Sequence, residues 1–536
     1  MLADKFNLAG VNEKIARDTA SAIIREVQGE RTLRGENYIT NWDMYQNRHE
    51  KYFKQRLDEP ENILKYRKDN AIKSNLCGFT VDLSAKYLYG KASKIVRNFS
   101  EKNKDTDKKI RKVLENVHIE SFLLDAAKKA AVYGETTVRL VPVDSVTGEQ
   151  VNDVSTENSY PHPILMEPIR TFVKCNKWGK IAAVVSLYFS QDYATNQKYS
   201  IIELVVSDSR WTWRSKGAID LYSFGNLKSL GAEPLFSEAE LVVNGVANNY
   251  ALEDEFIHFP NNDDLRSDLV DIIDLNIALD EALTDKQHFF QKHGWPQLVS
   301  EVSLENVTYS PNKIWEVIPD VDDKKKVLDR MGFLTWDGKM EDHAKFIKNL
   351  ERNIMILSNT AAISTGDLEA IGQLRSGAAL ITAHSVAIHK TEAKQIVWER
   401  NEEKLFWAIA RMDSYLHNEK VGGRYPDLDP CIKFPKTFVP GAEMEEAQIH
   451  QMELNSHTKA LSDIIQEKYG DLDPDEVEAK KSEILEDARS IVDSVREFIS
   501  VTAGTSQDSG SSNTGNAKGK SGTSSQKSAE QKPKAS

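Results

Sequence analysis

The segment Leu265–Ile363 constrains the fold of this chain most, because it combines two helical patterns with an insertion between them. Apolar residues recur at three- and four-residue steps over Leu265–His293, so one apolar stripe follows one side of a predicted helix. At about 1.5 Å per residue, this helix spans roughly 40 Å. Gly294 and Pro296 predict its end, because glycine favours a left-handed cap and proline cannot continue the hydrogen-bond ladder.

The second helical pattern, Met340–Ile363, repeats the same spacing with Phe346, Leu350 and Ile354. The insertion between the two patterns, Trp295–Lys339, contains short apolar runs that suit strands. Two helices with narrow apolar stripes suit a subunit that packs against copies of itself. A buried helical hairpin inside a monomer fits the same periodicity, and the pattern alone leaves both interpretations open.

Composition limits the class of protein. The chain has 536 residues, ample for a large core in several structural regions. It lacks a run of about 18 apolar residues, so we expect no membrane-spanning helix. Its three cysteines are too far apart for a zinc site or a disulfide framework, which suits a reducing cytoplasm. The net charge of -13 argues against a wide basic face that grips nucleic acid, although an acidic wall suits a protein past which DNA slides.

The rest of the chain predicts an α+β fold that is mainly helical. Helical patterns precede Gly90 and Gly134, and alternating apolar residues from Thr136 to Phe259 predict several strands. A very long helical pattern covers Ala378–Leu416, and two more helices are predicted before residue 503. Residues 503–536 are rich in Gly, Ser, Thr and Lys, which predicts a disordered tail.

Signatures of an enzyme are weak. Gly519-Lys520-Ser521 lies in the low-complexity tail, and Thr514 stands where a phosphate-binding loop needs glycine. His384 and His389 are five residues apart, so they do not share a helix face as a zinc pair would. For the acidic pairs we expect cap and surface roles: Asp263-Asp264, Asp280-Glu281 and Asp322-Asp323. We therefore predict no enzyme, no catalytic residue, no metal and no cofactor.

Four motifs in a fixed order resemble the portal proteins of tailed bacteriophages, of the type found in phages of Gram-positive hosts. They are Asn70-Ala71-Ile72-Lys73-Ser74-Asn75 with Tyr87-Leu88-Tyr89-Gly90-Lys91; Val132-Tyr133-Gly134-Glu135; Phe259-Pro260-Asn261-Asn262 with Ser267-Asp268; and Arg375-Ser376-Gly377-Ala378-Ala379-Leu380. The resemblance extends over most of residues 35–420. It is weakest in residues 144–255 and at the C-terminus.

The resemblance implies a portal fold with wing, stem, clip and crown regions, assembled as a ring. It divides the chain into a wing (1–264), a stem helix (265–294), a clip (295–339), a second stem helix (340–363), a tunnel loop (364–377), a further wing part with the long helix and a β tract (378–440), a helical crown (441–502) and a disordered tail (503–536).

The implied function is a DNA channel at one capsid vertex, which docks the packaging motor, passes DNA in and out, and connects the head to the tail. The implied partners are further copies of the chain, usually twelve in all, double-stranded DNA, the large terminase, a head–tail adaptor, and the major capsid and scaffolding proteins, with no membrane. The expected location is the portal vertex of the virion, after assembly in the host cytoplasm.

The resemblance also indicates candidate contact residues. In the tunnel loop, Gln373 and Arg375 are the candidates for DNA contact, and Gly372 and Gly377 would let the loop move. In the clip, Lys324, Lys325 and Lys326 are candidates for docking the motor or connector, although a solvated helix face is the more common role of such a run. Two other functions stay open: a nucleotide-driven DNA-packaging enzyme subunit, and a non-viral helical oligomeric scaffold.

Overall fold

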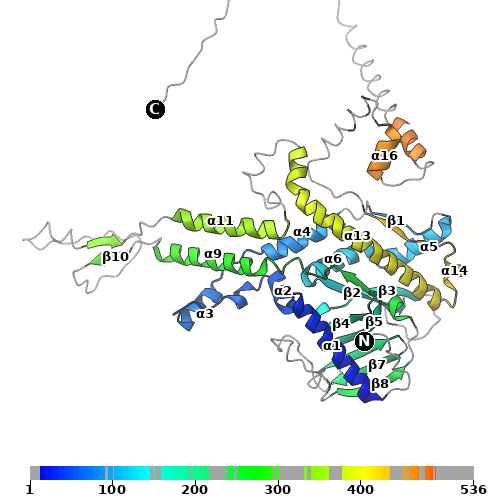
Figure 1. The fold of residues 1–536 in the computed structure, drawn as a ribbon, viewed down its shortest axis with the longest axis horizontal. Helices are drawn as coiled ribbons and strands as arrows, with labels where there is room; N and C mark the ends of the chain where they lie inside the picture. The colour runs from blue at the N-terminus through cyan, green and yellow to red at the C-terminus, as the bar shows by residue number, and fades with distance from the viewer. Residues whose placement is uncertain are drawn as a thin grey trace, which may run out of the picture. The chain divides into compact units, whose positions relative to one another are not determined.

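Figure 1 shows the fold in a computed structural model of the chain. The residues that the structure describes are 12–90, 95–100, 102–144, 150, 159–192, 196–207, 209–215, 236, 239–246, 250–293, 297–300, 331–334, 340–360, 377–434 and parts of 450–489. They belong to two compact units, Met1–Glu453 and Leu454–Ser536. The second unit contains α16 (Leu461–Tyr469), and everything below concerns the first.

In the described residues, a run of helices precedes the two larger sheets. They are α1 (Glu13–Leu33), α2 (Tyr38–Tyr45), α3 (Glu61–Asp69), α4 (Leu76–Tyr89), α5 (Lys104–Glu115) and α6 (Ile119–Tyr133), with a 3-10 turn η1 at His49–Tyr52. Asparagine side chains cap four of them by accepting backbone N–H groups of the first turn, from positions Asn12, Asn37, Asn75 and Asn103. The predicted ends at Gly90 and Gly134 are confirmed.

Two antiparallel sheets form the centre. One has the order β3-β2-β9, from Ser159–Leu165, Glu135–Asp144 and Phe256–Pro260. The other has the sequential order β4 to β8, from Thr171–Cys175, Ile181–Asp192, Gln197–Val206, Ser209–Ser215 and Ala239–Val246. Short turns join them: η3 (Pro168–Arg170) and α8 (Leu252–Glu255). This mixture confirms the α+β class.

The sheets lie between helices, in the order α1, five-stranded sheet, three-stranded sheet, α13. Alternate residues of the five-stranded sheet, such as Val185 and Leu204, pack with α1, since side chains of a strand alternate between its two faces. The other face looks toward β2, whose Arg139 forms ion pairs of 2.8 Å with Glu203 of β6 and with Glu255. All three of these charged side chains are buried.

The helix α13 (Gly377–Leu416) covers the outer face of the three-stranded sheet, where Trp398 and Phe406 share a core with residues of β2 and β9. Its observed bounds match the predicted Ala378–Leu416 closely. Beyond it lie α14 (Val421–Arg424) and β12 (Cys431–Lys433), which pairs with β1 (Val96–Asn98).

The helix–insertion–helix segment is present, but its first helix begins later and its second helix ends earlier than expected. The first helix, α9, covers Ile273–His293 and the second, α11, covers Met340–Leu357. Within the insertion, β10 (Gln297–Ser300) pairs with β11 (Met331–Leu334) in antiparallel fashion. Residues 265–272 are turns rather than helix, and Leu265 has a φ of 55°.

Candidate functional site

A row of polar side chains on one face of α9 binds the neighbouring chain segments. Asn276, Asp280 and Thr284 are four residues apart, so they share one helix face. Thr284 Oγ1 accepts the Ile72 N–H at 3.0 Å, and Asp280 Oδ1 accepts the Ser74 N–H at 2.7 Å. Asn276 Oδ1 accepts the N–H of Cys77, in the first turn of α4, at 3.1 Å. The first portal-like motif, residues 70–75, is therefore an extended strap that binds along α9.

Asp280 also joins α9 to the η1 turn. Its carboxylate forms a buried pair with His49 Nδ1, and His49 Nε2 lies 2.8 Å from the carbonyl oxygen of Met44. Both partners are completely buried. The sequence-based expectation of a cap or surface role for Asp280 is wrong, because the strap and η1 cover this face of the helix.

The outer part of α9 is held by the charged residues of α3. Arg67, which is buried, donates to Glu59 at 3.0 Å and reaches Glu281 of α9 at 3.3 Å and Asp285 at 3.7 Å. Tyr66 donates its hydroxyl proton to Gln291 at 3.1 Å. The strap and α3 thus accompany α9 for much of its length.

Two further motifs meet at the turn before α9. Gly134 has a φ of +83°, and a Cβ built there would lie 2.3 Å from the carbonyl oxygen of Leu265. The Asp268 N–H donates to the Ala131 carbonyl at 2.9 Å, and Ser267 Oγ donates to the Val132 carbonyl at 2.8 Å. Only glycine combines this backbone conformation with so close a contact.

Asp268 links this turn to α13. Its buried carboxylate pairs with Lys390 at 3.2 Å and with Lys394 at 2.6 Å, two lysines one helical turn apart. Burial alone would raise the pKa of Asp268, but Lys390 and Lys394 hold it well below its usual range. Burial lowers the pKa of Lys394 to about 8, against the opposing attraction of Asp268. The cluster therefore carries its charges at neutral pH.

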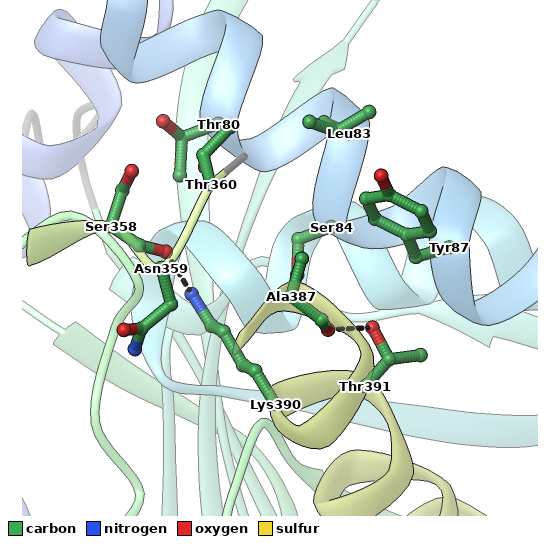
Figure 2. Close-up of a pocket in the computed structure, with 10 residues that line it drawn as sticks. All are labelled: Thr80, Leu83, Ser84, Tyr87, Ser358, Asn359, Thr360, Ala387, Lys390 and Thr391. Carbon is green, nitrogen blue, oxygen red and sulfur yellow. Dashed lines mark hydrogen bonds between the residues drawn. The ribbon is translucent and has the colours of Figure 1, made fainter. Parts of the chain in front are cut away.

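The same lysines reach the ends of two other helices. Lys390 Nζ donates to the Ser358 carbonyl at the end of α11 at 3.0 Å, and Lys394 Nζ donates to Ser84 Oγ of α4 at 2.9 Å. Figure 2 shows the small polar pocket at this junction, with Lys390 pointing from α13 toward Ser358. The lysine–aspartate cluster thus joins α4, α11, α13 and the turn before α9.

Glu36, which follows α1, contacts the same turn. Its carboxylate accepts the Ser267 N–H at 2.6 Å and an Asn41 amide proton at 2.7 Å. Burial raises the pKa of Glu36 to about 7, although both hydrogen bonds act to lower it. Glu36 thus titrates near neutral pH at the base of the helix pair.

The structure does not describe most of the predicted contact residues. Gln373, Arg375 and Gly372 of the tunnel loop lie outside the described residues, as do Lys324, Lys325 and Lys326 of the clip. Gly377 is the first residue of α13. Their predicted roles stay predictions.

Sequence reasoning missed the residues that fasten the helix pair: Asn276, Asp280, Asp268, Lys390 and Lys394. Asn276 falls at a stripe position of the predicted helix, and its polar character among apolar residues is the available signal. For the two lysines, no local pattern indicates a buried carboxylate partner more than 120 positions away.

In the described part of the chain, no cluster of His, Cys, Asp or Glu is arranged to hold a metal ion. Over the same residues, no helix combines the length and apolar character that crossing a membrane requires.

Comparison with known proteins identifies the class. Residues 24–434, more than half of the chain, match the family described as phage portal protein, SPP1 Gp6-like. A comparison with curated proteins returned no match. The chain belongs to the SPP1 Gp6-like family of phage portal proteins. It is thus a bacteriophage portal protein, a head–tail connector and a component of the virion capsid.

Proposed function

We propose that copies of this chain close into a ring of about twelve, around a DNA channel at one capsid vertex. The stem helices of the channel would be α9 and α11. DNA would enter and leave along the channel that the copies of this helix pair surround. The ring would assemble in the host cytoplasm, with the scaffolding and major capsid proteins as its first partners. The chain itself would perform no catalysis.

The observation that carries this proposal is the open surface of α11. Among the described side chains of α11, Ile347, Leu350, Ile354 and Met355 are the buried ones, and the first three share a core with residues of α9. Phe346 and Ile356 are 52% and 58% exposed, although both are large and apolar. A hairpin enclosed in its own subunit would have no such surface left, whereas a neighbouring copy would cover it.

The clip and the tunnel loop would have separate functions. Residues 295–339 would dock the large terminase and later the head–tail adaptor, with Lys324, Lys325 and Lys326 as contacts. Residues 364–377 would face DNA through Gln373 and Arg375. The net charge of -13 supports passage rather than grip, because each lysine or arginine contact to phosphate adds salt-dependent affinity.

Electron micrographs and native mass measurement of the pure chain test the ring. We expect closed annular particles with one predominant copy number. A monomer at every concentration would contradict the proposal. A stable dimer without rings would favour a helical scaffold instead, and ATP hydrolysis by the isolated chain would favour a packaging enzyme.

A further inference from the structure

Two long helices cover opposite faces of the layered body. The helix α1 packs on the outer face of the five-stranded sheet, and α13 packs on the outer face of the three-stranded sheet. A ring requires a heterologous contact, in which two different surfaces of one subunit meet those of its two neighbours. Helices on opposite faces have the placement that such a contact needs (Figure 1).

The side of α1 that faces away from the sheet presents a continuous line of exposed residues. We call it the α1 stripe: Ile15, Asp18, Ala22, Glu26, Gly29 and Leu33. Their steps of three and four residues place them on one helix face. Ile15 and Leu33 are 52% and 88% exposed, and no atom lies within 4 Å of a Cβ built on Gly29. The stripe therefore has apolar ends, a narrow middle and two carboxylates, of which Glu26 pairs with Lys174 of β4 at 2.7 Å.

The outward side of α13 presents a line with the same steps. We call it the α13 stripe: Val386, His389, Ala393, Ile396, Arg400 and Lys404. Val386 and Ile396 are both 56% exposed. Each stripe extends over 18 residue steps, about 27 Å at 1.5 Å per residue. The α13 stripe carries the opposite charge to the α1 stripe at its C-terminal end, where Arg400 and Lys404 lie.

The two helices run in opposite directions. The C-terminal end of α1 lies near the turn before α9, since the neighbouring Glu36 accepts the Ser267 N–H. The N-terminal part of α13 lies near the same turn, because Lys390 pairs with Asp268. From this turn both helices extend toward the lower right of Figure 1, α1 to its N-terminal end and α13 to its C-terminal end. A small rotation between neighbours in a ring would preserve this antiparallel relation.

We propose that the α13 stripe of one copy binds the α1 stripe of the next copy in antiparallel register. Leu33 then lies against Val386, Ile396 against Ala22, and Asp18 against Arg400. The large side chain of Ile396 fits opposite the small side chain of Ala22. Asp18 and Arg400 carry opposite charges. This interface rests on the proposed ring, and it assigns that ring its subunit contact in the body.

Cysteine cross-linking tests the register. In a background with Cys175→Ser and Cys431→Ser, the variant Ala22→Cys/Ile396→Cys is oxidised and run on a denaturing gel. We expect a ladder of covalent multimers. The mismatched variant Ala22→Cys/Val386→Cys, whose second position lies ten residues away along α13, and each single-cysteine variant are expected to stay monomeric on the gel.

The outcomes separate the interface from the ring. Rings in micrographs without a ladder from the matched pair, or an equal ladder from the mismatched pair, would overturn the interface and leave the ring standing. The background with Cys175→Ser and Cys431→Ser could fail to form rings although the unsubstituted chain forms them. The matched and mismatched pairs are then compared in a background that keeps Cys431. If the unsubstituted chain forms none, the ring and its interface fall together.

Charge exchange gives an independent measurement. We expect Asp18→Arg and Arg400→Asp each to raise the protein concentration at half-assembly about tenfold, with an unchanged circular dichroism spectrum. The double variant Asp18→Arg/Arg400→Asp is expected to return to within about threefold of the wild-type value, because the pair is restored with its signs exchanged. Single variants that assemble like the wild type, or a double variant as weak as both singles combined, would overturn the pairing.

Discussion

The substitution Asp268→Asn removes one negative charge from a buried cluster that holds two positive ones. Lys394 is 5% exposed, so it would keep its position in the interior without its nearest counter-charge. Removing one partner of a buried pair costs about 3–5 kcal/mol, because the remaining charge stays desolvated. Asparagine keeps one carbonyl oxygen as an acceptor, so we expect a loss of about 3 kcal/mol in the free energy of unfolding.

Urea unfolding followed by tryptophan fluorescence measures this loss. Trp398 is buried one turn after Lys394 on α13, so it reports on the affected region. The matched control is Asp271→Asn, because Asp271 is an exposed aspartate that pairs with Arg266 at 2.6 Å. We expect the control to lose less than about 1 kcal/mol.

Two further observations complete the test. Adding Lys394→Met to Asp268→Asn should recover at least about 1 kcal/mol, because the unpaired buried charge is removed. The pKa of Asp268 is lowered in the folded state, so its stabilising contribution is present above the pKa of the unfolded chain, near 4, and declines as the pH falls below that value. Equal losses for Asp268→Asn and Asp271→Asn at neutral pH would refute the reasoning.

Three other predictions concern Gly134, Glu36 and the proposed tunnel loop. Gly134→Ala should cost more than about 2 kcal/mol in urea unfolding, because its Cβ meets Leu265 at a positive φ, whereas Gly179→Ala, at φ +74° with open space around it, should cost only about 1 kcal/mol. The pKa of Glu36 is raised to about 7, so its contribution to the free energy of unfolding is complete below about pH 4.5 and is lost as the pH rises through 7. Glu36→Gln should therefore flatten this part of the stability–pH profile. An unchanged slope would contradict the raised pKa of Glu36. Deleting Gly372–Ser376 should leave rings intact in micrographs and impair DNA packaging; loss of assembly would refute the tunnel-loop assignment.

Sequence patterns predicted the helices that are long and regular. The α13 boundary was predicted within one residue, because glycine precedes a sustained periodic pattern. The start of α9 was placed eight residues too early, since the apolar spacing continues through a turn whose Leu265 has a positive φ. Periodicity reports which side chains are apolar, and it does not report where the backbone begins to be helical.

The fastening residues of the candidate site were not predictable in the same way. Asp280 and Asp268 are ordinary acidic residues in a polar stretch of sequence, and only the folded chain brings His49 and the α13 lysines to them. The motifs that supported the family resemblance include Asp268 and, through Ser74, a residue that binds Asp280. They gave no indication of these contacts, which required three-dimensional placement.

The ion pairs of Arg139 between the two sheets have a mechanical consequence. Displacing one sheet over the other by a single residue would separate Arg139 of β2 from Glu203 of β6, and Glu255 beside β9 from Arg210 of β7, and would disrupt this buried charge cluster. Apolar surfaces tolerate such sliding far better, because their attraction has little directional preference. The two sheets should therefore resist shear and move as a single block when force is transmitted through the helix pair.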